Sequence, residues 1–320
     1  MLNIVVLDGF AENPGDLSWK GFEDIGDLTV YDRTPSELIL ARSCDADVVL
    51  TNKTPLSRET IFALPRLKYI GVLATGYNIV DISAAKERGI PVCNVPSYGT
   101  DSVAQTCFAL ILETYLSVGA HDADVKNGGW CRCPDYSYSL HTLRELSGKT
   151  IGFIGFGRIG QRAADIAQAF GMNILAYDIK PSDQSHRKNF AFVPLDELLS
   201  RSDIISLHCN LTPENTGMIN KASIEKMKRS AIIVNTARGQ LVCENDLIDA
   251  LNSGRIAGAA LDVICSEPPS FSDPIFSAKN IIITPHISWS AIEARKRLMD
   301  TAVENLRCFL SGNTINAVNL

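Results

Sequence analysis

Short apolar runs rich in isoleucine and valine alternate with stretches of helical character along this chain, and this alternation constrains the fold more than any other feature. Near-continuous apolar runs are typical of strands buried on both faces of a parallel sheet. Parallel neighbours need a crossover connection, and the spacing between successive runs leaves room for one helix each time. The sequence therefore predicts an α/β fold built from βαβ units.

The runs form two series. The first predicts a small five-stranded unit, with strands at 4–7, 28–31, 48–50, 69–72 and 92–94. The second predicts strands at 150–154, 173–177, 204–208, 231–235, 258–263 and 281–283. Since a single core usually stops growing near about 250–300 residues, a chain of 320 residues is expected to form two domains.

Two helices are expected to cross between these domains. One is an amphipathic segment from Asp101 to about Gly119, and the other is a long final helix at Ser290–Leu310. The first domain is then discontinuous, with residues 1–99 and 288–320, and the second comprises residues 100–287. Within the second, residues 121–146, which we call the arm, are expected to be irregular.

Charge and composition exclude several classes of protein. The 30 basic and 36 acidic residues give a net charge of −6 without a basic block, so neither a nucleic acid nor an anionic membrane is an expected partner. No apolar run reaches the roughly 18 residues of a membrane-spanning helix. The amino terminus lacks a basic region and reaches Asp8 early, unlike a signal peptide.

The nine cysteines are scattered, odd in number and without a CxxC pair. Cys131 and Cys133, with His121 and His141 as conceivable partners, match no zinc-ligand spacing, so no metal site is expected. Most of the cysteines lie in apolar runs, where a free thiol behaves as a small buried hydrophobic group. A reduced, cytoplasmic protein is the favoured interpretation.

One glycine-rich turn indicates a dinucleotide site. Gly155, Gly157 and Gly160 form a GxGxxG motif between the strand at 150–154 and an alanine-rich helix. In that setting the first glycine permits the tight turn, the second lets a pyrophosphate approach the backbone, and the third allows close helix–strand packing. The helix amino terminus adds unpaired N–H groups for the phosphates. The second domain is therefore expected to be a Rossmann domain.

Asp178 ends the next strand, where a carboxylate can accept hydrogen bonds from both hydroxyls of the adenine ribose and repel a 2′-phosphate. This position favours NAD as the cofactor. Three basic residues downstream, Lys180, Arg187 and Lys188, could soften the preference, so NADP stays open as the less favoured alternative. The competing interpretation, a surface aspartate without a ligand, fits the complete βαβ setting less well.

Three candidate catalytic residues follow three successive apolar runs: Arg238, Glu267 and His286. The carboxyl ends of parallel strands share one edge of a sheet, so these side chains are expected to converge on one cleft. Together they match the reduction of a 2-keto acid. That reaction needs a cation for the carboxylate and ketone, a proton donor for the developing alkoxide, and a carboxylate that keeps the donor protonated near neutral pH.

The sequence resembles the D-isomer-specific 2-hydroxyacid dehydrogenases over essentially its whole length. The motifs that carry the resemblance are VLATGYNIVD (72–81), GTDSVAQ (99–105), GKTIGFIGFGRIGQ (148–161), NTARG (235–239), DVICSEPP (262–269) and TPHISWS (284–290). Within the family the chain is most similar to the glycerate dehydrogenase (hydroxypyruvate reductase) group, as GDLSW (15–19), TNKTPL (51–56), PDY (134–136) and Trp289 indicate.

The resemblance implies a fold, an activity and further site residues. It implies a Rossmann NAD-binding domain and a smaller flavodoxin-like substrate domain, both doubly wound parallel sheets. The implied activity is the NAD(H)-dependent reduction of hydroxypyruvate or glyoxylate to the D-2-hydroxy acid, and the reverse oxidation. Besides Arg238, the implied substrate-binding residues are Ala74, Thr75, Gly76 and Trp289. Besides the glycines and Asp178, the implied cofactor-binding residues are Val103, Arg158, Ile159, His208, Pro213, Thr236, Ala237, Arg238, Asp262, His286 and Ser288.

Two loop positions depart from the pattern, because Cys243 and Cys265 stand where polar residues are expected. They leave substrate preference and sensitivity to oxidation open. Two other functions are also possible on this fold. One is an NAD(H)-sensing binding protein similar to a transcriptional corepressor, which the intact catalytic set and the lack of terminal extensions disfavour. The other is a formate or phosphite dehydrogenase, which the motifs of the glycerate dehydrogenase group disfavour.

The arm also predicts an oligomer. Trp130, Tyr136 and Tyr138 lie close together in this segment, with no sheet or long helix of their own to bury them. Aromatic residues of this kind are typical of interface cores, and two-fold symmetry is the commonest arrangement of soluble homo-oligomers. The family resemblance likewise implies a homodimer formed through this region. A flexible flap on a monomer is the alternative.

Overall fold

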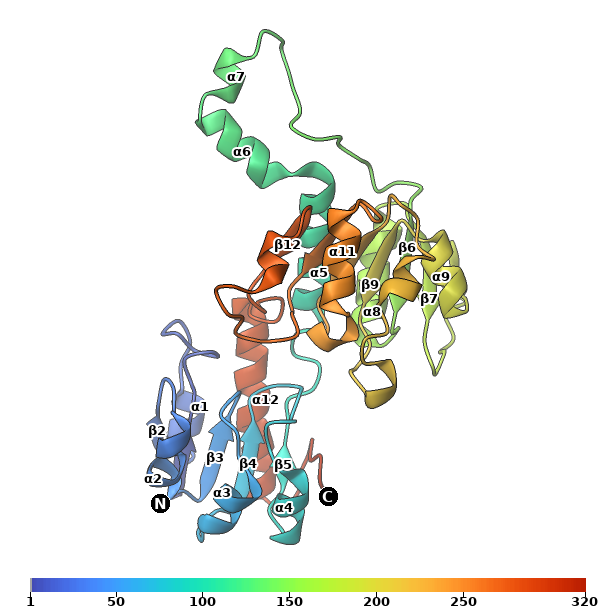
Figure 1. Ribbon diagram of the computed structural model, residues 1–320. Helices are drawn as coiled ribbons and strands as arrows, with labels where there is room; N and C mark the ends of the chain where they lie inside the picture. The colour runs from blue at the N-terminus through green and yellow to red at the C-terminus, as the bar shows by residue number, and fades with distance from the viewer. Residues whose placement is uncertain (1) are drawn as a thin grey trace. The chain divides into compact units, whose positions relative to one another are not determined.

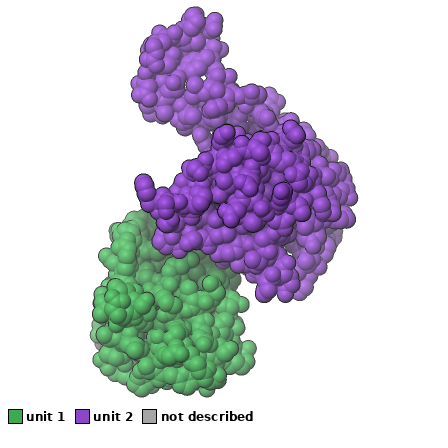
Figure 2. Space-filling view, in the orientation of Figure 1, with its two compact units in different colours: residues 1–99, 290–320 green, residues 100–289 purple. Residues whose placement is uncertain are grey.

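The computed structural model describes residues 2–320, and the chain divides into two compact units (Figures 1 and 2). Unit 1 extends to Gly99 and resumes at Ser290–Leu320, and unit 2 is Thr100–Trp289. Each unit has its own parallel sheet and its own apolar core, so each is described by itself. The expected fold class, two doubly wound α/β units, is confirmed.

Unit 1 contains a five-stranded sheet in the order β2-β1-β3-β4-β5, with every pair parallel. This order is that of flavodoxin-like folds. The strands are β1 (Asn3–Val6), β2 (Asp27–Val30), β3 (Val48–Thr51), β4 (Tyr69–Val72) and β5 (Val92–Cys93). The helices are α1 (Lys20–Glu23), α2 (Ile39–Ser43), α3 (Arg58–Ala63), α4 (Ile82–Glu87) and α12 (Ile292–Leu310).

A buried carboxylate organises the loops at the carboxyl edge of this sheet. Asp8, just beyond β1, accepts hydrogen bonds from the backbone N–H groups of Asn52 at 2.8 Å, Lys53 at 2.6 Å and Thr54 at 2.6 Å. The Asn52 side chain in turn donates to the carbonyl of Leu73 at 2.7 Å. The loops after β1, β3 and β4 are thereby fixed to one another, because a buried donor without a partner is costly.

Unit 2 contains a seven-stranded sheet in the order β12-β11-β10-β9-β6-β7-β8, again with every pair parallel. The strands are β6 (Thr150–Ile154), β7 (Asn173–Tyr177), β8 (Phe190–Phe192), β9 (Ile204–Leu207), β10 (Ile232–Asn235), β11 (Gly258–Leu261) and β12 (Ile281–Ile283). The main helices are α5 (Thr100–Leu116), α8 (Arg158–Ala169), α9 (Leu195–Arg201), α10 (Lys221–Ile224) and α11 (Glu244–Asn252). The order reverses between β6 and β9, as in a Rossmann fold.

The strand β8 was not expected from the sequence. It is a short edge strand of three residues, and its two phenylalanines contact Phe156 with ring centroids 5.0 and 5.7 Å away. A run this short lacks a detectable period, and only its parallel pairing with β7 in the structure identifies it as part of the sheet.

The expectation that the arm is irregular is wrong for its first half. The structure shows two helices there, α6 (Val118–Lys126) and α7 (Gly129–Arg132), joined to α5 through Ser117 in a left-handed conformation. The helix expected to reach Gly119 therefore ends at Leu116. No residue of α6 or α7 is buried, so neither helix has the apolar period on which a prediction depends. In Figure 1 both helices stand apart from the seven-stranded sheet of their unit.

Among residues 2–320, no single helix is long and apolar enough to cross a membrane. Only α5 and α6 taken together pass such a test, and they are bent by 56° relative to each other. Much of α5 is buried against its own unit, where it contributes Cys107, Phe108 and Ile111 to the core.

Candidate functional site

Two of the three glycines at the start of α8 are required by the fold itself. Gly155 has a φ of +89°, and a Cβ there would lie 2.5 Å from the backbone nitrogen of Cys209. A Cβ on Gly160 would lie 2.5 Å from the carbonyl oxygen of Gly155. The tight turn and the close helix therefore exclude any side chain at both positions.

Gly157 is different, because nothing in the fold requires a glycine there. Its φ of −74° suits any residue, and a Cβ would meet no atom within 4 Å. It is the N-cap of α8, and no side chain of residues 2–320 caps this helix. The space beside the first N–H groups of α8 is thus open, which fits the pyrophosphate of a dinucleotide.

Thr236 gives a second indication of a ligand at this edge of the sheet. It follows β10 directly, its side chain is buried, and its hydroxyl oxygen has no hydrogen-bond partner among the described residues. Most buried hydroxyl groups in proteins have a partner. A polar group of a bound cofactor would complete the hydrogen bonding of Thr236.

Asp178 is fixed at the end of β7 by two backbone amides. Its Oδ2 accepts a hydrogen bond from the N–H of Phe156 at 2.6 Å, and its Oδ1 accepts one from the N–H of Lys180 at 2.8 Å. The first bond ties the carboxylate to the GxGxxG turn. The remaining lone pairs of both oxygens stay available to ribose hydroxyls.

Arg187 is not available to a 2′-phosphate, contrary to one alternative drawn from the sequence. Its side chain is 6% exposed and forms an ion pair with Asp165 at 2.6 Å. Its Nε also donates to Gln184 at 2.8 Å. Of the three downstream basic residues, only Lys180 and Lys188 have exposed side chains.

His208 follows β9 and is a neutral imidazole. Burial lowers its pKa to about 4. Its Nε2 is 2.8 Å from the hydroxyl of Ser206, and its ring lies 5.5 Å from that of Phe153. A histidine that stays neutral near pH 7 can line a ligand site, but it cannot serve there as the proton donor.

Arg238, Glu267 and His286 follow β10, β11 and β12, which are neighbours in the sheet. Because these strands are parallel, all three residues lie beyond the same carboxyl edge, which also carries the GxGxxG turn. The structure therefore brings the three residues selected from the sequence to one edge of unit 2.

His286 and Glu267 form a direct pair. The Nδ1 atom of His286 lies 2.6 Å from Oε2 of Glu267, and Oε1 of Glu267 accepts a hydrogen bond from the N–H of Ile264 at 3.0 Å. Because Nδ1 is engaged by the carboxylate, Nε2 is the nitrogen that can exchange a proton with a ligand. His286 also has a φ of +54°, a left-handed backbone that is rare outside glycine and common at functional sites.

The loop that carries His286 is held by Asp262, which directly follows β11 and is 1% exposed. Its Oδ1 accepts hydrogen bonds from the hydroxyl of Thr284 at 2.6 Å and the N–H of Ile287 at 2.9 Å. Its Oδ2 accepts one from the N–H of Ser288 at 2.9 Å, and its carbonyl accepts one from the N–H of His286 at 2.8 Å. Asp262 thus fixes the backbone on both sides of the histidine.

Gly239 brings the Arg238 loop close to the loop that carries Glu267. A Cβ on Gly239 would lie 2.0 Å from the carbonyl carbon of Ile264, so no other residue fits there. Arg238 itself is exposed, and its Nη1 donates to the carbonyl of Ala237 at 2.7 Å. The rest of its guanidinium can reach a ligand at the carboxyl edge.

The two unexpected cysteines differ in their surroundings. The backbone N–H of Cys265 donates to the carboxylate of Glu244 at 2.6 Å. Burial, together with this negative charge, raises the pKa of the Cys265 thiol to about 12. A thiol is reactive as the thiolate, so Cys265 is not a site of ready oxidation. Cys243 is the half-buried N-cap residue of α11.

In unit 1, the loop after β4 presents unpaired backbone donors. The carbonyl of Ala74 accepts a hydrogen bond from the N–H of Val95 at 3.0 Å, and the hydroxyl of Thr75 donates to the carbonyl of Val95 at 2.9 Å. Among the described residues, nothing accepts a hydrogen bond from the N–H groups of Ala74, Thr75 and Gly76. Three consecutive free amides suit a carboxylate.

The other residues selected from the sequence are distributed as follows. Val103 is buried in the first turn of α5, Arg158 is exposed and Ile159 half-buried in the first turn of α8, Pro213 is exposed, Ser288 is buried, and Trp289 is half-buried.

Ser102 was not singled out from the sequence, although it lies within a quoted motif. Its hydroxyl donates to the carbonyl of Ser288 at 2.6 Å, so the first turn of α5 supports the His286 loop. A serine in a helix often bonds locally, and nothing in the sequence reveals a partner so far along the chain.

Among residues 2–320, no three His, Cys, Asp or Glu side chains gather where they could hold a metal ion. His121, one conceivable zinc ligand, is occupied otherwise. Its Nδ1 is 2.7 Å from the carbonyl of Ser117, and its Nε2 accepts the N–H of Leu140 at 3.0 Å.

Comparison with known proteins shows close relatives. Residues 108–288 match the family model described as "D-isomer specific 2-hydroxyacid dehydrogenase, NAD binding domain". A hydroxypyruvate reductase of Blautia hydrogenotrophica is 53% identical, with 99% of this chain and 100% of that protein covered. A glycerate dehydrogenase of Methylorubrum extorquens is 38% identical, with 89% of each chain covered.

Among solved structures, a D-lactate dehydrogenase of Aquifex aeolicus in complex with NAD and lactic acid superimposes with a TM-score of 0.84. It is 29% identical to this chain, and the match covers 99% of each chain.

The two kinds of glycine predict different effects of substitution. Gly157→Ala places a methyl group in the open space at the start of α8, so we expect NADH affinity to fall by about tenfold or more, with an unchanged melting temperature. Gly155→Ala forces a side chain into a left-handed turn and against Cys209, so we expect a loss of stability of about 1–3 kcal/mol. Calorimetric NADH titration and urea unfolding of both variants measure the two effects. Equal NADH affinity in Gly157→Ala and the native protein would contradict this assignment.

Proposed function

This chain belongs to the D-isomer specific 2-hydroxyacid dehydrogenase family, and from that premise we propose that it reduces hydroxypyruvate to D-glycerate with NADH and catalyses the reverse oxidation. Glyoxylate is the second substrate that the proposal includes. The observation that carries the chemistry is the contact of 2.6 Å between His286 and Glu267, beside the loop of Arg238. The named relatives support hydroxypyruvate as the substrate.

Each catalytic residue has one role in this proposal. NADH, when bound, supplies the hydride that reduces the ketone carbon. Nε2 of His286 donates the proton to the oxygen on which negative charge develops, and the Glu267 carboxylate stabilises the imidazolium before the transfer. The Arg238 guanidinium holds the substrate carboxylate and polarises the ketone oxygen. His208 stays neutral and takes no part in the proton transfer.

The proposal extends to the residues that bind the two ligands. In unit 1, the free N–H groups of Ala74, Thr75 and Gly76 receive the substrate carboxylate. In unit 2, the amino end of α8 receives the pyrophosphate and Asp178 receives the ribose hydroxyls. The remaining assignments rest on the family alone: Trp289 contacts the substrate, and Val103, Arg158, Ile159, His208, Pro213, Thr236, Ala237, Asp262 and Ser288 contact the cofactor.

Removal of the proton donor tests the chemistry. In His286→Ala we expect kcat for hydroxypyruvate reduction to fall by about 10²–10⁴-fold, the usual contribution of a general acid, with NADH affinity nearly unchanged. In Glu267→Gln we also expect kcat to fall, because the imidazolium that donates the proton no longer contacts a carboxylate. Initial rates with saturating NADH measure both. Near-native turnover in His286→Ala or Arg238→Ala would refute the assignment.

Asp178 sets the choice of cofactor. The native enzyme is expected to prefer NADH over NADPH, because the carboxylate repels a 2′-phosphate and the Arg187 guanidinium is already paired with Asp165. Asp178→Ser should reduce the ratio of the two kcat/KM values by about tenfold or more. Equal kcat/KM for both cofactors in the native enzyme would show that Lys180 or Lys188 compensates and that the proposed preference is wrong.

We propose further that the chain forms a homodimer through the arm. Trp130 is 51% exposed and Tyr136 is 94% exposed, and Leu140 and Leu143 of the same arm are also exposed. The arm is nevertheless ordered internally, because the Trp130 indole donates to the carbonyl of Tyr136 at 3.0 Å and the Tyr138 hydroxyl donates to Asp124 at 2.6 Å. An ordered segment with exposed aromatic side chains has the composition of an interface core.

The molar mass of the protein in solution tests the proposed dimer. Light scattering at micromolar concentration should give twice the mass of one chain, and the double variant Trp130→Ala, Tyr136→Ala should shift the protein toward the monomer by weakening the interface core. A native mass of one chain would rule the dimer out. A dimer unaffected by the double substitution would place the main contact elsewhere.

A further inference from the structure

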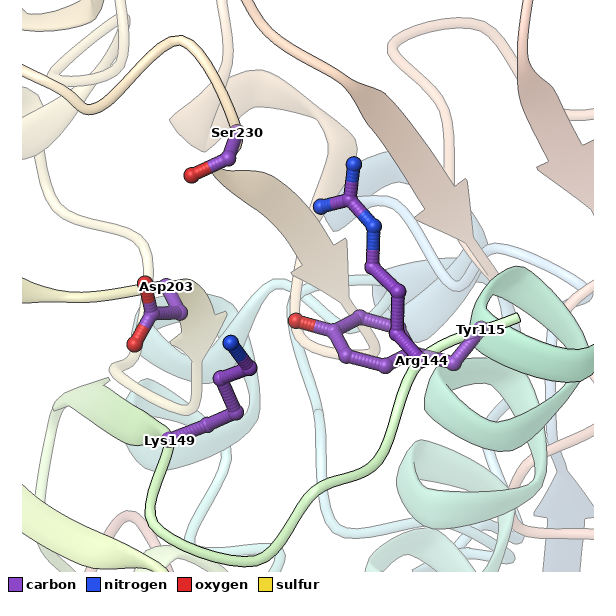
Figure 3. Close-up of a pocket in the computed structure, with 5 residues that line it drawn as sticks. All are labelled: Tyr115, Arg144, Lys149, Asp203 and Ser230. Carbon is purple, nitrogen blue, oxygen red and sulfur yellow. The ribbon is translucent and has the colours of Figure 1, made fainter. Parts of the chain in front are cut away.

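A cationic cavity lies at the edge of the unit 2 sheet opposite to the GxGxxG turn. It has a volume of about 170 Å³ and is lined by Tyr115, Arg144, Lys149, Asp203 and Ser230 (Figure 3). Three of these residues lie at the amino ends of parallel strands, since Lys149 precedes β6, Asp203 precedes β9 and Ser230 precedes β10. The cavity is therefore separate from the site where NAD and substrate are expected to bind, at the carboxyl edge.

Tyr115 is the central observation. The residue belongs to the last turn of α5 and is 4% exposed, and no described residue forms a hydrogen bond with its hydroxyl, which faces the cavity. Figure 3 shows the hydroxyl directed into the space between the five side chains. Burial, together with the charge of Asp203, raises the pKa of Tyr115 to about 12, so the group stays a hydrogen-bond donor near neutral pH.

The two cations beside Tyr115 are also unpaired. Among the described residues, no acidic side chain lies within ion-pair distance of Arg144 or Lys149. The single carboxylate in the cavity is already engaged, because Asp203 accepts hydrogen bonds from Lys228 at 2.8 Å and from the N–H of Thr150 at 2.9 Å. Although burial acts to raise the pKa of Asp203, these two partners and the charge of Lys149 lower it overall.

We propose that this cavity binds a phosphoryl group, either as free phosphate or as part of a small phosphate ester. A guanidinium, an ammonium and two hydroxyl groups approach the cavity from different sides, which suits a tetrahedral dianion with four oxygens. The cavity has room for about six molecules of water, so a small anion fits without rearrangement. This site is additional to the proposed catalytic function and does not depend on it.

Binding there would connect two parts of unit 2. Arg144 lies at the end of the arm, where its N–H donates to the carbonyl of Tyr115 at 3.3 Å, and Lys149 lies directly before β6. A bridging anion would neutralise both cations and hold the end of the arm against the sheet.

Calorimetric titration of inorganic phosphate tests the proposal. The full-length enzyme is first saturated with NADH, which occupies the amino end of α8, and ionic strength is fixed with sodium chloride. We expect one phosphate per chain. Arg144→Gln should raise Kd by about tenfold or more, and Tyr115→Phe, which keeps the buried ring, should raise it about two- to tenfold.

Matched controls locate the bound anion. Arg229→Gln removes a neighbouring exposed cation that does not line the cavity, so Kd should stay within about twofold. Titration with sn-glycerol 3-phosphate then identifies the source: tighter binding than that of phosphate supports an ester, and equal or weaker binding supports the free ion. The proposal is wrong if phosphate does not bind at millimolar concentration, or if binding survives Arg144→Gln and Tyr115→Phe and is lost in Arg238→Gln.

Discussion

The carboxyl edge of the unit 2 sheet, where the proposed catalytic residues lie, depends on one buried carboxylate. Asp262 directly follows β11, yet its hydrogen bonds go to the loop that follows β12, through the hydroxyl of Thr284 and the N–H groups of Ile287 and Ser288. A buried carboxylate must be fully hydrogen-bonded to remain in an apolar core. This requirement couples the ends of two neighbouring strands on both sides of His286, whose backbone has a φ of +54°.

Other contacts also hold the loops at this edge of the sheet in place. Gly239 allows the Arg238 loop to approach the 264–265 backbone, and Glu267 is anchored to the N–H of Ile264 while it contacts His286. Three loops at adjacent strand ends are thus held together by one close backbone approach and by the carboxylates of Asp262 and Glu267. Groups held in place before a reaction need no reorganisation when charge develops, and this accounts for much of enzymatic catalysis.

The sequence predicts the structure where a local pattern of residues determines it. It does not predict the features that depend on contacts between distant segments. The alternating apolar runs gave the parallel sheets, and the GxGxxG turn and the strand ends located the candidate residues. The hydrogen bonds that the Asp262 carboxylate accepts, and the ion pair between Arg187 and Asp165, depend on contacts between distant segments of the chain. The helices α6 and α7 were not predicted, because neither contains a buried residue and their sequences have no apolar period.

The activity proposed for this edge of the sheet is the reduction of a small 2-keto acid, hydroxypyruvate or glyoxylate, with D-glycerate as the product from hydroxypyruvate. The most direct test is the initial rate of NADH oxidation with hydroxypyruvate, glyoxylate, pyruvate and longer 2-keto acids, followed by chiral analysis of the product. We predict the highest kcat/KM for hydroxypyruvate or glyoxylate, and D-glycerate as the product from hydroxypyruvate. L-glycerate as the product, or activity confined to formate or phosphite with NAD, would contradict the account.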